Sequence, residues 1–118
     1  MAEMAWTSFD KPSKIFEFSV RKNRNKIHPT QKPVELYEWL LKMYAKPNDK
    51  ILDTHLGSGT IAIACYQCGF DLTACEIDYQ YFKKAIKKIE NDCNSSFKKV
   101  GDAFLLESNI FVETLFMN

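Results

Sequence analysis

The chain has 118 residues, 46% of them hydrophobic and 26% charged, which is the composition of one small globular domain and leaves no room for two. No apolar run approaches the roughly 20 residues that cross a bilayer, and the N-terminus lacks a secretory leader pattern, so we expect a cytoplasmic protein without a membrane segment. The net charge is +1. The four cysteines (Cys65, Cys68, Cys75 and Cys93) are expected to be reduced rather than part of a secreted disulfide scaffold.

Basic residues gather near the N-terminus. The first 33 positions hold seven lysines and arginines against three acids, whereas the remainder holds nine against twelve. Residues 15–20 alternate apolar and polar side chains, as a half-buried strand does, and a loop containing Arg21, Lys22, Arg24 and Lys26 follows. A basic arm on a near-neutral domain is suited to nucleic acid, although such clusters are often only solvated loops. This loop is the candidate DNA-binding segment.

Helix and strand signals alternate after the basic loop. Thr30 is predicted to cap a helix whose first turn admits Pro33 and which ends near Ala45. Short apolar runs predict buried strands at 50–53 and 71–76. The apolar residues at helical spacing in the first helix are Leu36, Leu40, Met43 and Tyr44.

A nearly all-apolar segment joins the two predicted strands. Residues 58–67 predict a buried helix with Gly69 at its C-terminal end, and Asp78 is expected to cap a further helix. Two strands linked by a helix imply a parallel βαβ unit with a right-handed crossover. The residues expected to point inward from the later helix are Phe82, Ala85, Ile86 and Ile89.

The predicted architecture is a single α/β domain over 1–118. It comprises a strand and basic loop (1–27), a βαβ core with its preceding helix (28–93) and a weakly defined C-terminal segment (94–118). Within the last part, 99–106 is compatible with a third strand, and the apolar tail 110–116 needs something to pack on.

The turn between the first strand and its helix is the most informative stretch. Gly57 and Gly59 are expected to let the backbone turn sharply and approach a ligand, although strand-to-helix turns also use glycine for structural reasons. Asp53 ends the strand just before this turn, where its carboxylate would repel a pyrophosphate. It would attract the ammonium and sulfonium groups of S-adenosylmethionine.

Two further features fit a nucleoside cofactor. Glu76 ends the second strand 23 residues after Asp53, a spacing at which a carboxylate accepts hydrogen bonds from ribose hydroxyls; the alternative is an acid that merely begins the next helix. The segment 28–33 leads into a helix whose N-terminus would attract the carboxylate of a methionine moiety, or it is simply a stiff, capped loop.

Together, these segments resemble the cofactor-binding half of a DNA amino-methyltransferase. The matching motifs are HPTQKP (28–33), LDTHLGSGT (52–60) and CEID (75–78), in the order of the permuted arrangement in which the catalytic motif lies N-terminal to the cofactor motifs. The resemblance covers about 6–89. It implies a partial Rossmann-like fold of the S-adenosylmethionine-dependent methyltransferases and transfer of a methyl group to adenine N6, or less often cytosine N4, as in restriction-modification.

The resemblance also implies a set of cofactor-binding residues. His55 departs from the family, which commonly has Pro-Phe where this chain has Thr54-His55; we expect it to lie under the loop in place of the aromatic ring, not to act as a base. The implied set is His28, Thr30, Gln31, Lys32, Pro33, Asp53, His55, Gly57, Ser58, Gly59, Thr60, Glu76 and Ile77.

One family motif is missing from this sequence. The family holds its flipped-out target base with an Asp/Asn/Ser-Pro-Pro-aromatic motif, and this chain has no Pro-Pro pair. No catalytic residue can therefore be assigned. We expect the chain to be the cofactor half of a longer enzyme, a truncated product or one piece of a split one, inactive alone, with DNA and the missing half as partners and self-association as a further possibility.

Two other interpretations stay open. A dinucleotide-binding Rossmann domain is one, because Gly57 to Ala62 also fits GxGxxA, although Asp53 argues against it. A non-catalytic DNA-associated remnant is the other. A metal or redox site is disfavoured, since Cys65 and Cys68 lie inside a buried helix pattern and no second pair has zinc spacing.

Overall fold

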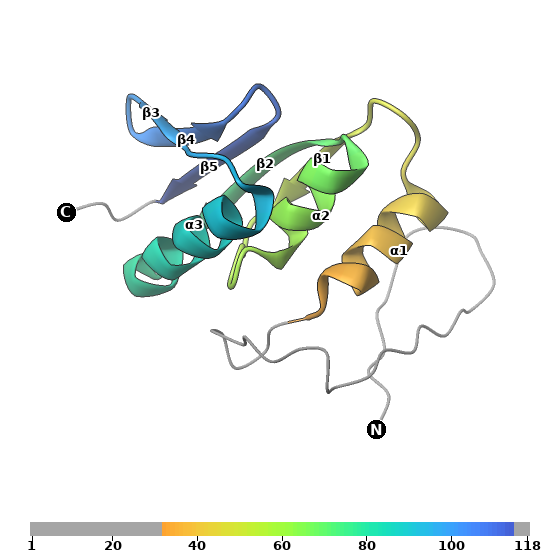
Figure 1. The fold of residues 1–118 in the computed structure, drawn as a ribbon, viewed down its shortest axis with the longest axis horizontal. Helices are drawn as coiled ribbons and strands as arrows, with labels where there is room; N and C mark the ends of the chain where they lie inside the picture. The colour runs from red at the N-terminus through yellow and green to blue at the C-terminus, as the bar shows by residue number, and fades with distance from the viewer. Residues whose placement is uncertain (1–31, 115–118) are drawn as a thin grey trace.

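A five-stranded sheet organises residues 32–114, the part of the chain that the computed structural model describes (Figure 1). Its strands run in the order β1-β2-β5-β4-β3. The elements, in chain order, are α1 (Val34–Tyr44), β1 (Lys50–Asp53), α2 (Thr60–Cys68), β2 (Asp71–Glu76), α3 (Tyr79–Cys93), β3 (Lys98–Val100), β4 (Ala103–Leu106) and β5 (Ile110–Thr114).

The parallel βαβ core is as predicted. β1 and β2 pair in parallel with Ile51 opposite Leu72, and α2 connects them. The prediction that the first strand is buried is wrong for the described part of the chain, where β1 pairs only with β2 and forms the sheet edge. Leu52 is 72% exposed, because its side chain lies on the face of the sheet that no described helix covers.

The two later helices match their sequence signals. α2 lies between α1 and α3, so close packing is required there, and Ala62 and Ala64 are fully buried. Gly69 ends α2 with a φ of 80°, the left-handed conformation that glycine adopts most easily. Asp78 caps α3 by accepting a hydrogen bond from the Tyr81 N–H at 3.0 Å.

The first helix begins later than the sequence indicates. Pro33 is its N-cap residue, with an extended ψ of 149° and no side-chain cap, so the predicted cap at Thr30 is wrong; Thr30 itself lies outside the described residues. The helix ends at Ala45 as expected. The residues of α1 that pack on the core include Val34, Tyr37 and Leu41.

The C-terminal segment completes the sheet. The stretch predicted as one strand is a hairpin of β3 and β4, whose turn contains Gly101 at a φ of 64°. β5 then inserts between β2 and β4, parallel to the first and antiparallel to the second. The apolar tail therefore packs by joining the sheet, with Ile110 and Val112 fully buried. The predicted strand at 15–20 lies outside the described residues.

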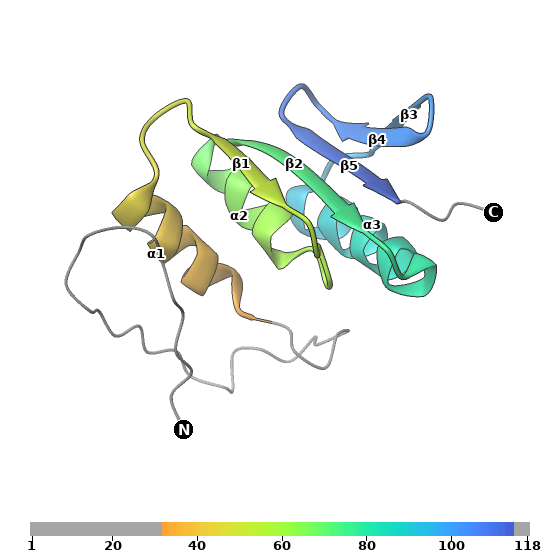
Figure 2. The same ribbon diagram turned by 180° about the vertical axis from the view of Figure 1, so that it is seen from behind.

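All described helices lie on the same side of the sheet (Figures 1 and 2). Seen from behind in Figure 2, β1, β2, β5 and β4 lie in front of the helices with no described helix over them. None of the helices within 32–114 is long and apolar enough to cross a membrane. Four residues that pair across neighbouring strands form one row on this uncovered face: Leu52, Thr73, Phe111 and Leu105.

Candidate functional site

The candidate site lies at the carboxyl ends of β1 and β2. Because the two strands are parallel neighbours, Asp53 and Glu76 end at the same edge, and the turn 54–59 lies between them (Figure 2). A 2.9 Å hydrogen bond from the Leu56 N–H to the Cys75 carbonyl connects the turn to β2. This edge is where open α/β sheets bind their ligands.

Glu76 holds two backbone segments together. Its Oε1 accepts a hydrogen bond from the Gly57 N–H at 2.7 Å, and its Oε2 accepts one from the Asp78 N–H at 2.9 Å. The side chain is buried, with 6% of its surface exposed. Glu76 thus anchors both the glycine turn and the start of α3, and its predicted role toward a ribose remains a prediction.

Gly59 is required by the packing of the turn on α3. Its φ is 87°, and a Cβ built there would lie 2.8 Å from Ile89 Cδ1 and 3.3 Å from Ala85 Cβ. A side chain at position 59 would therefore collide with α3, and the predicted approach of Gly59 to a ligand stays a prediction. Gly57 also has a positive φ, of 62°.

Asp53 is the second carboxylate at this edge. Its Oδ1 accepts the His55 N–H at 3.0 Å. Burial raises the pKa of Asp53, and the Glu76 carboxylate acts in the same direction, while the hydrogen bond and charge of His55 oppose them. Burial, followed by the Asp53 charge, raises the pKa of Tyr37 on α1. Tyr37 is therefore a neighbour of the site that the sequence did not reveal.

His55 does not lie under the turn. The side chain is exposed, and its Nδ1 is 2.8 Å from the Thr54 hydroxyl. The expectation that His55 replaces a buried aromatic ring is wrong, because Leu56, 4% exposed, takes the inward position of the turn.

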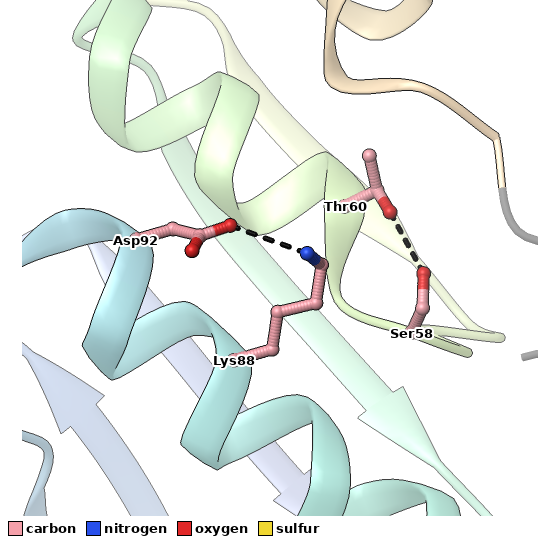
Figure 3. A network of polar contacts seen from close by, with 4 residues as sticks. All are labelled: Ser58, Thr60, Lys88 and Asp92. Atoms are coloured by element: carbon pink, nitrogen blue, oxygen red, sulfur yellow. Dashed lines mark hydrogen bonds and ion pairs between the residues drawn. The ribbon is translucent and has the colours of Figure 1, made fainter. Parts of the chain in front are cut away.

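A hydroxyl of the turn and one of the first residue of α2 face one another. Ser58 Oγ and Thr60 Oγ1 are 2.7 Å apart and buried, as Figure 3 shows. Ile77, by contrast, is 58% exposed beside Glu76. Of the predicted methionine-end residues, Lys32 and Pro33 are half-buried before α1, whereas His28, Thr30 and Gln31 lie outside the described residues, as do Arg21, Lys22, Arg24 and Lys26.

Thr114 is a site neighbour that sequence reasoning missed. It pairs with Glu76 across β2 and β5, and its Oγ1 is buried without a hydrogen-bond partner in the described structure. A buried hydroxyl without a partner is costly, so Thr114 is a polar group beside Glu76 that the described residues leave unsatisfied. The only sequence signal was the apolar tail, which did not predict which strand it would join.

The cysteines are free thiols. Burial raises the pKa of Cys65 to about 12 and that of Cys93 to about 11, so neither is a thiolate at neutral pH. Within residues 32–114, no group of three or more His, Cys, Asp or Glu side chains is placed to hold a metal ion.

A glycine turn between parallel strands, flanked by two carboxylates, is the arrangement of a Rossmann-like α/β domain. Residues 4–88 match the DNA methylase family, and the chain belongs to that family. The fold agrees with a putative DNA modification methylase of Thermus thermophilus, solved in complex with S-adenosyl-L-methionine; the TM-score is 0.51 at 24% identity, covering 71% of this chain and 29% of that one. The chain therefore has part of the Rossmann-like methyltransferase fold.

Curated relatives point to the same family. The Type II methyltransferase M.HpaI of Haemophilus parainfluenzae is 34% identical over 87 residues, which are 70% of this chain and 27% of that protein. M1.MboII of Moraxella bovis, also a Type II methyltransferase, is 30% identical over 79 residues, or 60% of this chain and 30% of that protein. The chain thus spans under a third of the length of these relatives.

Proposed function

We propose that this chain is the S-adenosylmethionine-binding part of a DNA N-methyltransferase that methylates an exocyclic base amine, adenine N6 ahead of cytosine N4. One observation carries the proposal: the 2.7 Å hydrogen bond from the Gly57 N–H to Glu76 joins the glycine turn to β2 at the edge where β1 ends in Asp53. Membership of the DNA methylase family supports the reaction class.

The residues at this edge fit the cofactor. Asp53 supplies negative charge for its cationic methionine end, and Glu76 retains a lone pair on each oxygen for the ribose hydroxyls beyond its two backbone bonds. The unpartnered Thr114 hydroxyl beside Glu76 is a third polar group ready for a ligand. Bound S-adenosylmethionine supplies an electrophilic methyl group, and the role of this chain is to bind and orient it.

DNA contact is assigned to the basic loop of Arg21, Lys22, Arg24 and Lys26 and to a catalytic portion that this chain does not contain. The relatives are more than three times as long as the matched stretch, and the sequence has no Pro-Pro-aromatic motif. We place that portion N-terminal to the cofactor motifs in the permuted order. It would come from the same gene or from a partner chain.

Titration calorimetry of the purified chain tests the cofactor assignment. S-adenosylmethionine is expected to bind with release of heat, whereas NAD is expected to give no saturable signal because Asp53 repels its pyrophosphate. Binding of NAD in preference to S-adenosylmethionine would establish the dinucleotide-binding alternative. Binding of neither would leave the chain as a DNA-associated remnant.

We further expect the chain alone to transfer no methyl group and to associate with itself or with a partner. The outer edge of β1 carries backbone N–H and C=O groups without a strand partner in the described structure, and Leu52 is exposed beside it. Two measurements apply: transfer of labelled methyl to mixed-sequence DNA, and solution mass across a concentration series. Robust transfer would mean that catalytic residues lie within 1–118, and a strictly monomeric species would mean that another segment covers this edge.

A further inference from the structure

A cavity of about 400 Å³ lies between α3 and β4, and no residue of the glycine turn lines it. Its apolar wall is aromatic: the Phe82 and Phe104 rings are 5.3 Å apart at an angle of 60°, and the Tyr79 ring stacks at 6.3 Å from Phe82. Phe82 is buried at the base, whereas Tyr79 and Phe104 remain partly exposed. We call this the aromatic pocket. Its size is that of a small-molecule site.

The rim of the aromatic pocket is positively charged. Lys83, Lys84 and Lys87 line it from α3 and are exposed, and no Asp or Glu lines it. Lys83 Nζ lies 5.5 Å from the centre of the Tyr79 ring. Lys99 pairs with Phe104 across β3 and β4 and so adds a fourth exposed lysine to the same side of the sheet.

These rim lysines differ from the neighbouring Lys88. Lys88 Nζ is 3.3 Å from Asp92 Oδ2, so its charge is compensated within α3 (Figure 3). No carboxylate forms an ion pair with Lys83, Lys84 or Lys87 in the described part of the chain. Uncompensated charge around an apolar wall is complementary to an anion that carries a flat apolar group.

We propose that the aromatic pocket binds an unpaired nucleotide of a DNA strand, with the base against Tyr79 and Phe104 and the flanking phosphates at Lys83, Lys84 and Lys87. Aromatic rings interleaved with lysines are how proteins hold single strands without reading their sequence. The choice of DNA over an acidic peptide rests on the proposed function. Because α3 begins directly after the carboxyl end of β2, the Tyr79 end of the pocket lies near the edge that holds the candidate cofactor site.

The charge contribution is tested by fluorescence anisotropy with a short labelled oligothymidylate and the full 118-residue chain. The combined Lys83→Glu, Lys84→Glu and Lys87→Glu variant is expected to bind at least tenfold more weakly, with a shallower dependence of log affinity on log salt. The matched control reverses Lys42, Lys46 and Lys50, three exposed lysines on α1, its following turn and β1, with the same change in net charge. Equal losses in both variants would overturn the proposal, as would no binding by the parent.

The stacking contribution is tested with an abasic strand of the same length. The parent is expected to prefer the strand with bases by about tenfold, and Tyr79→Leu, which keeps an apolar side chain, is expected to lose most of this preference. Circular dichroism checks that each variant is folded. No preference in the parent, or an aromatic acidic peptide that binds where the strand does not, would overturn the nucleotide assignment.

Cofactor titration separates this proposal from the proposed function. The pocket variants are expected to bind S-adenosylmethionine as the parent does, because no pocket residue belongs to the candidate cofactor site. Loss of strand binding with intact cofactor binding concerns the aromatic pocket alone. Strand binding by a parent that does not bind S-adenosylmethionine would overturn the proposed function and leave the pocket assignment standing.

Discussion

Gly59→Ala is expected to lower the free energy of unfolding by about 3 kcal/mol, combining the cost of a left-handed backbone for alanine with overpacking in a closed space. The new Cβ would lie 2.8 Å from Ile89 Cδ1 and 3.3 Å from Ala85 Cβ. Both neighbours are fully buried on α3, so the Ile89 side chain has to shift within the core to admit the new methyl group. Chemical denaturation followed by circular dichroism measures the change.

Gly69→Ala is the matched control for this variant. Gly69 has nearly the same φ, 80°, but nothing lies within 4 Å of a Cβ built there. Its replacement therefore reports the backbone cost alone, about 1 kcal/mol. The difference between the two variants measures the contact of the glycine turn with α3, and equal losses would refute that contact as the reason for glycine at position 59.

Glu76→Gln is expected to weaken both the fold and cofactor binding. An amide nitrogen in place of one carboxylate oxygen would face the N–H of Gly57 or Asp78, leaving a buried donor without an acceptor at a cost of about 1 to 3 kcal/mol. Loss of a charged acceptor for the ribose would weaken the binding of S-adenosylmethionine by a similar free energy. The dissociation constant would rise roughly ten- to a hundredfold. Glu76→Ala is expected to act in the same direction.

Glu90→Gln provides the control, because Glu90 Oε2 also accepts a backbone N–H, from Phe97 at 2.7 Å, near the far end of α3. Both variants should lower the unfolding free energy, and only Glu76→Gln should alter the titration with S-adenosylmethionine. An unchanged dissociation constant for a folded Glu76→Gln protein would remove Glu76 from the cofactor site and leave it as an anchor of the turn.

Local signals in the sequence determined most of the elements from β1 to α3. The apolar runs at 50–53 and 71–76, the apolar helix between them, Gly69 at its end and the Asp78 cap each depend on neighbours within a few residues. The positions of Asp53, the glycine turn and Glu76 relative to one another also follow from their spacing along the chain. Short-range geometry is therefore readable from residue types alone.

The tertiary structure alone decided what depends on distant segments. The insertion of β5 beside β2 places Thr114 next to Glu76, and only the approach of α3 shows that Gly59 makes room for Ile89. Leu52 has the apolar character of a buried residue, yet it is exposed because no described helix covers its face of the sheet. Pairing register, strand order and helix contact arise from non-local packing, which residue types and their spacing do not specify.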